Sequence, residues 1–540
     1  MKDISSTGSF INFYLNNYIY VDKTQYIRDL IKLERVFISR PRRFGKSLTL
    51  DTIATLFETG VDPYFKGTWI YDKWTEPTYP VLRLNFLDLD KYSLEHFKQK
   101  LNAIISSFAR DINVKNYEEK VEPEDTIYFL LDELRKEKRQ IVILIDEYDC
   151  QMTANINNET LYKQFHEKIK SFYANIKNKW PIKFLGITGV TRLKDVEIFS
   201  IGSDINDITN DSVYSQMIGF TRDEIKKHYI DYLTLAASYE NKCRVEEVTD
   251  TQIESMLDMM AQNYDGYCFD EFYKKKVFST WSVNKFFQSV VSNKFVYFGE
   301  YWYDNGGLPS ILVNYLKTHE LNIFEYLDKD KFLKVSSDDF KNPTALTTIN
   351  QNVLMCQTGY LTLRSDLNKT STVALGIPNG EIYKALNRLL ANNIFKGNTD
   401  ITDDYGRSLL EVGTVDDIIN LFNSALNSVS YDNYPIVSES SVQNMLKLYL
   451  LGAHQKVLSE VHEAKGRADL VVNTDNRRIV FEFKYAKNET EAKSKLLDAV
   501  EQIKTRDYGN IVPKKTELLR IAAVFNADPK VRAFTEYQKV

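Results

Sequence analysis

Residues 37–47 read Phe37-Ile38-Ser39-Arg40-Pro41-Arg42-Arg43-Phe44-Gly45-Lys46-Ser47. The apolar start of this stretch predicts a buried strand over residues 35–39, and the amphipathic residues 48–58 predict a helix after it. A strand, a loop ending in Gly-Lys-Ser and a helix follow one another in a phosphate-binding loop. The stretch therefore indicates an α/β nucleotide-binding fold.

The loop departs from the usual pattern G-x-x-x-x-G-K-[ST], because Arg40 occupies the first glycine position. The remaining residues of the loop retain the groups that bind phosphate and Mg²⁺. Gly45 lets backbone N–H groups approach phosphate oxygens, Lys46 can reach the β- and γ-phosphates, and Ser47 can ligate Mg²⁺. We therefore expect ATP and Mg²⁺ as ligands, with these cofactor-binding residues in the loop: Arg40, Arg43, Phe44, Gly45, Lys46 and Ser47.

A Gly-Lys-Ser sequence alone is weak evidence of a nucleotide site, and a second predicted strand that ends in acidic residues supplies the missing support. Residues 141–145 are a continuous aliphatic run, typical of a strand buried on both faces of a parallel sheet, and Asp146-Glu147-Tyr148-Asp149 follows. In P-loop ATPases the first acid after this strand holds Mg²⁺. We assign that metal- and cofactor-binding role to Asp146, and we expect Glu147 to orient and deprotonate the attacking water. A solvated acidic turn is the less favoured alternative.

Two more strands, over residues 81–86 and 183–188, alternate with helices and predict a doubly wound parallel sheet. The second strand ends in Gly189-Val190-Thr191-Arg192. A polar residue there could sense the γ-phosphate, and Arg192 could stabilise its charge as a catalytic residue. An arginine in a loop is equally often a surface residue, so both interpretations stay open.

Four motifs together resemble the AAA-ATPase-like family: residues 20–24 (YVDKT), 40–47 (RPRRFGKS), 146–149 (DEYD) and 186–190 (GITGV). The arginine at the first glycine position also resembles that family's own loop. Members of this family typically join the ATPase to a C-terminal PD-(D/E)XK nuclease-like domain. The resemblance therefore implies an ATPase core over residues 1–218 and a nuclease-like domain near the C-terminus.

The middle of the chain turns helical from Gly219, and we expect a helical lid over residues 219–345. The aromatic motif 264–269 resembles one of the same family, and we expect it to pack the lid rather than to take part in catalysis. Residues 346–430 form a mixed connecting region with a strand at 360–363 and a helix at 381–392.

Residues 466–472 and 479–484 form a hairpin pattern within a predicted domain over residues 431–540. If Asp475-Asn476 is its two-residue turn, the register places Asp469 directly opposite Glu482. Lys484 is two residues further on and so shares the face of Glu482. Opposite side chains in such a pair lie about 5 Å apart at Cβ.

Two carboxylates and an amine at one point suit metal-dependent phosphodiester hydrolysis. We assign Asp469 and Glu482 to catalysis and to a Mg²⁺ ion, with Mn²⁺ as an alternative, and Lys484 to positioning the attacking water. Glu460, in preference to Glu463, is the expected further metal ligand. With Gln502 and Tyr508 the pattern resembles the PD-(D/E)XK nuclease fold; a structural ion-paired hairpin is the alternative.

The whole chain of 540 residues is 43% hydrophobic and 26% charged with a net charge of −5, so a nucleic-acid partner requires a local basic patch. Seven basic residues after the hairpin could meet a phosphate backbone or, equally, form a solvated helix face: Lys487, Lys493, Lys495, Lys504, Arg506, Lys514 and Lys515. A polar start, no bilayer-spanning apolar run and four dispersed cysteines predict a cytoplasmic protein without a membrane partner.

Three functions fit these observations. The first is an ATP-dependent nuclease that cuts nucleic acid, with DNA as the expected substrate. The second is an ATPase switch whose nuclease-fold domain binds nucleic acid or protein without cutting. The third is a protein-remodelling ATPase with a C-terminal adaptor. AAA-type ATPases often assemble into rings, so a homo-oligomer is an open expectation.

Overall fold

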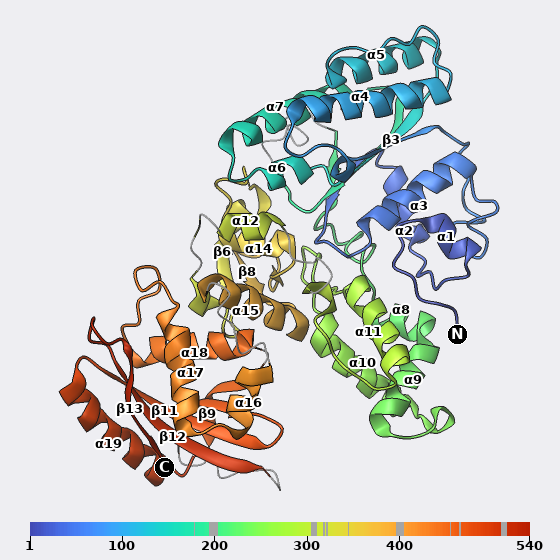
Figure 1. Ribbon diagram of the computed structural model, residues 1–540. Coiled ribbons are helices and arrows are strands. Elements are labelled where there is room, and N and C mark those ends of the chain that lie inside the picture. Colours follow the sequence, from blue (N-terminus) through green and yellow to red (C-terminus); the bar gives the residue numbers. More distant parts are fainter. Residues whose placement is uncertain are drawn as a thin grey trace. The chain divides into compact units, whose positions relative to one another are not determined.

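The computed structural model describes residues 1–177, 179–193, 204–303, 310–316, 319, 322–343, 345–395, 404–453, 455–463, 466–508 and 516–540 (Figure 1). Within these ranges, nothing is described of the side chains of Ser310, residues 404–407, Lys456, Glu460, His462 and Glu463. The chain forms two compact units. Unit 1 comprises Met1–His319 and Phe332–Ile382, and unit 2 comprises Glu320–Lys331 and Tyr383–Val540.

Unit 1 is built on a parallel five-stranded sheet, as the alternating pattern predicts. Its order is β2 (Val81–Asn85), β3 (Ile141–Asp146), β4 (Ile182–Gly189), β1 (Arg35–Ser39) and β5 (Asn206–Asp207). All five residues of β1 and the first five of β3 are buried, because helices cover both faces of a doubly wound sheet. The short β5 is an edge strand that the sequence did not predict.

The helices of this core lie on the two sides of the sheet: α1 (Phe10–Leu15), α2 (Thr24–Ile31), α3 (Lys46–Thr59), α4 (Leu94–Asp111), α5 (Pro123–Lys136), α6 (Cys150–Ala154) and α7 (Glu159–Ile176). A 3₁₀ turn, η1 (Phe86–Asp88), follows β2. Figure 1 shows the layer of α4, α5 and α7 on one side and α3 on the other. The helix α3 packs against β2 and β3 and carries the residues that follow the phosphate loop.

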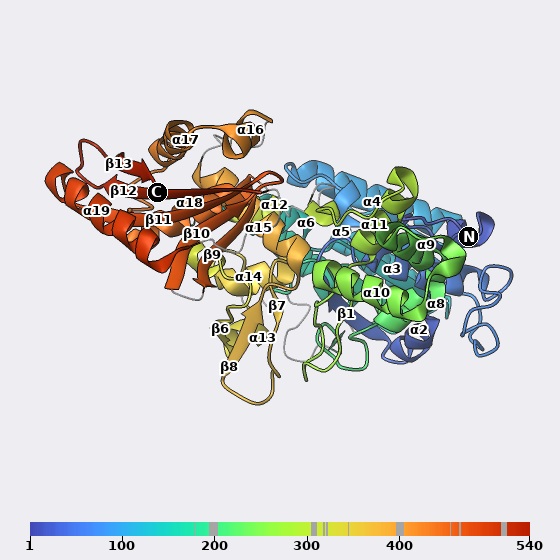
Figure 2. The same ribbon diagram turned by 90° about the horizontal axis from the view of Figure 1, so that it is seen from below.

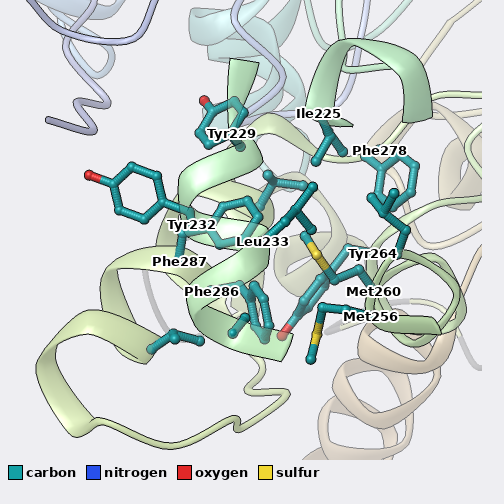
Figure 3. Packing of buried hydrophobic residues seen from close by; sticks show 14 of the residues in the cluster. Ile225, Tyr229, Tyr232, Leu233, Met256, Met260, Tyr264, Phe278, Phe286 and Phe287 are labelled. Atoms are coloured by element: carbon teal, nitrogen blue, oxygen red, sulfur yellow. The ribbon is translucent and has the colours of Figure 1, made fainter. Parts of the chain in front are cut away.

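Four helices form the predicted lid: α8 (Arg222–His228), α9 (Ile230–Asn241), α10 (Asp250–Tyr264) and α11 (Thr280–Asn293), with a 3₁₀ turn at Val245–Glu247. A capping box fixes the start of α8, because Thr221 accepts from the backbone of Glu224 while Glu224 accepts from that of Thr221. Aromatic, Met and aliphatic side chains from all four helices make one buried cluster (Figure 3). This cluster holds the lid helices together as one body.

The rest of unit 1 contains α12 (Ser310–Leu316), α13 (Ser337–Lys341), α14 (Gln351–Thr358) and a three-stranded antiparallel sheet in the order β6 (Leu333–Ser336), β8 (Thr372–Gly376), β7 (Thr362–Leu363). The Cys268 backbone N–H donates to the Thr362 hydroxyl at 2.8 Å and joins this sheet to the aromatic motif. Residues 346–382 of the predicted connecting region therefore fold with unit 1, and the two units do not coincide with the four predicted segments.

Unit 2 has a mixed five-stranded sheet in the order β13 (Ala533–Lys539), β12 (Glu517–Asn526), β11 (Arg477–Ala486), β10 (Gly466–Asn473), β9 (Lys456–Glu463). Only β11 and β12 pair in parallel, and α19 (Glu489–Arg506) connects them. The other helices are α16 (Asp404–Val412), α17 (Val415–Asn427) and α18 (Glu439–Gly452), with most of α15 (Gly380–Ile394) and a 3₁₀ turn at Ile323–Glu325.

The helices α17 and α19 cover opposite faces of this sheet (Figure 2). Phe422 of α17 packs against Phe481, whereas α19 packs against Val480, and neighbouring residues of a strand point to opposite faces. Glu482 shares the face of Val480. A charged residue is therefore buried on the same face as the apolar cluster under α19.

No helix in the described part of the chain is both long enough and apolar enough to cross a membrane.

Candidate ATP and nuclease sites

The phosphate loop runs from the end of β1 to Gly45, which caps the N-terminus of α3. Gly45 has φ 104° and Arg43 has φ 69°, so the loop uses the left-handed region twice in three residues. The Gly45 conformation explains why this position is a glycine. The turn leaves the first N–H groups of α3 facing the space where an anion would bind.

Lys46 lies at the first position of α3 and is buried. Its ammonium donates to the backbone carbonyls of Arg40 at 3.0 Å and Pro41 at 3.3 Å, and it lies 3.6 Å from Oε1 of Glu147. These contacts keep the cation inside the curve of the loop. A triphosphate in that curve would meet a charge that is already in position.

Asp146, at the end of β3, is hydrogen-bonded to α3 and to β4. Ser47 donates to its Oδ2 at 2.6 Å, and the hydroxyl of Thr188, from β4, donates to its Oδ1. The predicted metal ligands Ser47 and Asp146 are therefore adjacent. The hydroxyl and carboxylate oxygens suit Mg²⁺, which usually takes one or two protein ligands together with phosphate oxygens and water. Thr188 is the polar residue of β4 that touches this group.

Glu147 directly follows and has φ 52°, an unusual conformation for a glutamate. Burial raises the pKa of its carboxyl, and the charges of Lys46 and Arg42 oppose that rise. A carboxylate with a raised pKa is the better proton acceptor. The position and pKa of Glu147 both suit its predicted role with the attacking water.

A pocket of about 500 Å³ opens in front of the loop. Its walls are the loop and first turn of α3 (42–49), Glu147, the N-terminal residues 5–8, residues 19–23 and the lid residues 217–220 with Tyr229, Trp281 and Asn284. This volume lies within the range of small-molecule sites, about 300–1,000 Å³. Both charged residues, among them Arg42, Lys46 and Glu147, and apolar residues line the pocket, as a nucleotide requires.

The lid and its neighbours hold the loop from outside. The indole of Trp302 donates to the Arg42 carbonyl at 3.2 Å, and the Thr280 hydroxyl donates to the Arg43 carbonyl at 3.0 Å. The Arg43 guanidinium lies 4.1 Å from the ring centre of Trp281. Trp302 and Thr280 were not identified from the sequence, because nothing in their local pattern refers to a loop so far upstream.

Phe44 is buried between the rings of Tyr267 and Phe269, with ring centres 4.7 Å and 5.6 Å away. The aromatic motif was predicted to pack the lid: Tyr264 lies in the lid cluster, whereas Tyr267 and Phe269 pack against the phosphate loop. Its contribution to the site is indirect. The motif fixes Phe44, the loop residue next to Gly45, and both of these loop residues line the pocket.

Arg40 does not fit its predicted role. Its guanidinium is fully buried, donates to the carbonyls of Ser39 and Thr209, and lies 4.1 Å from the ring centre of Phe269. Burial lowers its pKa to about 9. The side chain points behind the loop because β5 and the aromatic motif bind it there, so it does not line the nucleotide pocket.

Arg192 is also placed elsewhere. Its guanidinium pairs with Asp207 and donates to the Lys341 carbonyl at 2.7 Å, and it is not among the residues of the nucleotide pocket. This arrangement does not support a contact with the γ-phosphate. Its partners come from β5 and α13, which the sequence pattern did not connect with the loop.

Asp149 is buried and accepts from the Thr191 backbone at 2.7 Å and from the Thr191 hydroxyl at 2.6 Å. Tyr148, also fully buried, donates to the Thr191 carbonyl at 3.2 Å. The acidic turn after β3 is thus bonded to the end of β4 and is not a solvated turn.

In unit 2 the hairpin has the predicted register. Thr474 and Arg477 close a two-residue turn at Asp475-Asn476, and the ladder from Asn473↔Arg478 to Leu470↔Phe481 continues to Asp469 opposite Glu482. At that point Oδ2 of Asp469 accepts from the Phe483 backbone at 2.8 Å. The aspartate is therefore fixed against the strand that carries the other two residues.

Glu482 and Lys484 form a close ion pair, with Nζ 2.8 Å from Oε1. Glu482 is 1% exposed and its other oxygen, Oε2, has no hydrogen-bond partner among the described residues. Burial and the nearby charge of Asp469 raise the pKa of Glu482 to about 7, and Lys484 opposes the rise. A cation between the carboxylates would relieve their repulsion and supply the missing partner.

Glu439, the first residue of α18, was missed from the sequence. Its Oε1 lies 3.4 Å from the Lys484 ammonium, which brings a third acid beside the hairpin. The side chain of Glu460 lies outside the described part, so its predicted role stays a prediction. No group of three or more His, Cys, Asp or Glu side chains suited to a metal exists among the described residues. Asp469 and Glu482 would offer a Mg²⁺ ion two carboxylates, the kind of oxygen ligand that it prefers.

Gln502 and Tyr508 belong to the same neighbourhood. The Gln502 amide donates to the Tyr508 hydroxyl at 3.3 Å, and Arg506 donates to the same oxygen at 3.0 Å. A Cβ on Gly466 would lie 2.6 Å from Cδ of Arg506 and 3.2 Å from the Tyr508 ring. Gly466 is therefore small because these side chains pass across the start of β10.

The basic residues after the hairpin are partly paired. Lys493 and Lys495 form i,i+4 ion pairs with Glu489 and Glu491 on α19. For these two the solvated helix face is the better interpretation. Lys514 and Lys515 lie outside the described residues.

Comparisons with known proteins agree with this geometry. Residues 5–199 match the family model described as predicted AAA-ATPase, AAA-ATPase_like, and residues 437–534 match that of the PD-(D/E)XK nuclease superfamily. The chain is similar to the "Uncharacterized protein in vnfD 5'region" of Azotobacter chroococcum mcd 1, with 25% identity over 95% of this chain and 94% of that protein. Among solved structures, Cdc6p from Pyrobaculum aerophilum aligns with 66% of this chain and 89% of its own, at 11% identity and a TM-score of 0.22.

The two family matches cover the two sites described above, one in each unit. Residues 5–199 thus match the predicted AAA-ATPase family, and residues 437–534 match the PD-(D/E)XK nuclease superfamily.

Proposed function

We propose that the chain binds and hydrolyses ATP in unit 1 and thereby controls metal-dependent cleavage of nucleic acid, with DNA as the substrate, in unit 2. The observation that carries the ATPase half is that Lys46, Ser47 and Glu147 line the 500 Å³ pocket, with Asp146 bonded to Ser47 beside it. The observation that carries the nuclease half is the buried, half-partnered Glu482 between Asp469 and Lys484.

In the ATPase site, Lys46 binds the β- and γ-phosphates, and the N–H groups at the start of α3 bind the same oxygens. Ser47 and Asp146 would hold a Mg²⁺ ion, which would neutralise charge on the phosphates. Glu147 accepts a proton from the water that attacks the γ-phosphorus. The lid excludes bulk water from the pocket through residues 217–220 and Trp281.

In the nuclease site, Asp469 and Glu482 hold a Mg²⁺ or Mn²⁺ ion, which supplies a polarised phosphate and a water of lowered pKa when bound. Lys484 lies 2.8 Å from Glu482 and orients the attacking water or stabilises the charge of the phosphate. The bond between Phe483 N–H and Asp469 keeps the carboxylate at the strand. The four cysteines are free, which suits the proposed cytoplasmic location.

The test uses the purified full chain with DNA and RNA substrates and Mg²⁺ or Mn²⁺, with and without ATP. We expect ATP turnover in the wild type, its loss in Lys46→Ala, and loss of cutting with retained ATP turnover in Glu482→Ala. The absence of ATP turnover would reject the ATPase half. Binding of nucleic acid without cutting under every condition would reject the nuclease half in favour of a binding module.

A further inference from the structure

Phosphoryl transfer needs positive charge at the γ-phosphate besides the lysine and the metal, and P-loop enzymes often obtain it from an arginine in the same chain or in a neighbour. Four arginines of unit 1 lie in or near the loop: Arg40, Arg42, Arg43 and Arg192. In the structure the guanidinium groups of these arginines make different contacts, and the contacts distinguish the roles of the four residues.

Two of the four are held away from the pocket. Arg40 is buried against Phe269 and the Thr209 carbonyl, and Arg192 is paired with Asp207. Arg43 lines the pocket but stacks on the Trp281 ring, on the lid side. Arg40 and Arg43 therefore hold the loop against the aromatic motif and the lid, and Arg192 is bound to residues outside the loop.

Arg42 is different. It is half-buried and lines the pocket together with Lys46, Ser47 and Glu147. Its carbonyl is fixed by the indole of the fully buried Trp302, so the backbone from which the side chain projects has a defined position. Among the described residues its guanidinium makes no hydrogen bond or ion pair, while its charge acts on the carboxylate of Glu147.

We propose that Arg42 contacts the γ-phosphate of bound ATP and stabilises in cis the charge of the transition state, so that hydrolysis needs no arginine from a second copy of the chain. This inference rests on the proposed ATPase function. An arginine suits the task because its planar guanidinium can bind two phosphate oxygens at once.

The reaction balances with the residues described. The water oxygen forms a bond to the γ-phosphorus while the bond from that phosphorus to the β–γ bridging oxygen breaks. The water proton passes to Glu147, and the products are ADP and inorganic phosphate. Arg42 forms no covalent bond and changes no oxidation state; it interacts with the γ-oxygens as their charge develops.

The experiment compares the wild type with Arg42→Ala, Arg42→Lys and Arg110→Ala, which removes an exposed arginine from the end of α4 as a matched control. ATP turnover and the affinities for ATP and ADP are measured on the full chain. We expect Arg42→Ala to lower kcat on the order of 10³-fold, the lower end of the effect of such arginines. We expect it to weaken ATP binding about tenfold or more while ADP binding changes little.

The separate measurement of ADP distinguishes a phosphate contact from a structural role. If Arg42 only supports the loop, ATP and ADP lose affinity equally, and the inference is overturned. A kcat of Arg42→Ala within about threefold of the wild type also overturns it. Arg42→Lys keeps a charge and the loop, so partial activity is expected there even if the alanine variant folds poorly.

Dilution tests whether the arginine acts in cis. Turnover per chain is expected to stay constant down to concentrations at which the chain is monomeric. A fall to background on dilution would show that a second copy completes the site. A wild type without ATP turnover would instead reject the proposed function itself, which keeps the two failures distinguishable.

Discussion

The hydroxyl of Ser47 donates a 2.6 Å hydrogen bond to the carboxylate of Asp146, across the sheet from the first turn of α3 to the end of β3. Thr188 donates to the other oxygen of the same carboxylate. One acid thus collects contacts from the ends of β3 and β4 and from the phosphate loop. Glu147, the next residue, is directed toward Lys46, so the site separates a metal-binding acid from a proton-accepting one.

Glu147→Gln tests that separation. The amide keeps the size of the side chain but cannot accept the proton, so ATP should still bind while turnover falls about 10²- to 10⁴-fold. Nucleotide affinity by calorimetry and phosphate release measure the two effects. Glu95→Gln, at an exposed position in the first turn of α4, is the control. Turnover near the wild-type rate would show that another group deprotonates the water.

Thr280→Val tests the support that the lid gives to the loop. Valine has the same shape but lacks the hydroxyl that donates to the Arg43 carbonyl. Loss of one such hydrogen bond should weaken ATP binding about three- to tenfold and leave the unfolding temperature nearly unchanged. Thr234→Val is the matched control, because its hydroxyl bonds only to the Ile230 carbonyl within α9. Equal affinities of Thr280→Val and Thr234→Val for ATP would contradict the support of the loop by Thr280.

The sequence predicted what local patterns determine. The turn at Asp475-Asn476 and the two-residue period of strands set the register of Asp469 and Glu482, and the strand–loop–helix order placed Ser47 beside Asp146. Partners from distant segments were not predictable. Arg40 and Arg192 are held by residues of β5 and α13, and Glu439 reaches Lys484 from another helix, so only the tertiary fold places these charges.

Glu482 gives the stability of unit 2 a pH dependence. Its pKa is about 7 in the folded chain, against a usual value of 4.5. Below pH 4.5 both states are protonated; between 4.5 and 7 the unfolded chain releases the proton that the folded chain keeps. Without metal, stability should therefore fall as pH rises through this window and stay constant above it.

Glu482→Gln removes this titration, so the stability of the variant relative to the wild type should increase from pH 5 to pH 7 by a few kcal/mol at most, since about 1.4 kcal/mol corresponds to one pH unit. Hydrogen exchange of β11 in the presence of a chelator measures the stability of unit 2. Glu501→Gln, exposed on α19, is the control. A stability difference between Glu482→Gln and the wild type that does not change with pH would contradict the raised pKa of Glu482.

Divalent metal should reverse the loss of stability that the buried, ionised carboxylate of Glu482 causes. A cation held by Asp469 and Glu482 binds the folded unit and not the unfolded chain, so Mg²⁺ or Mn²⁺ at 100 times its Kd should stabilise unit 2 by about 2.7 kcal/mol. Binding requires the ionised carboxylate of Glu482, so the stabilisation should grow as pH rises through about 7. Asp469→Asn and Glu482→Gln should lose most of this stabilisation by metal, whereas Glu501→Gln should keep it.

Because hydrogen exchange of β11 reports the stabilisation by metal without nucleic acid, the result is independent of whether the protein cuts. Equal stabilisation of the wild type and Asp469→Asn by metal would show that the ion binds elsewhere, and the ion-paired hairpin would then have only a structural role.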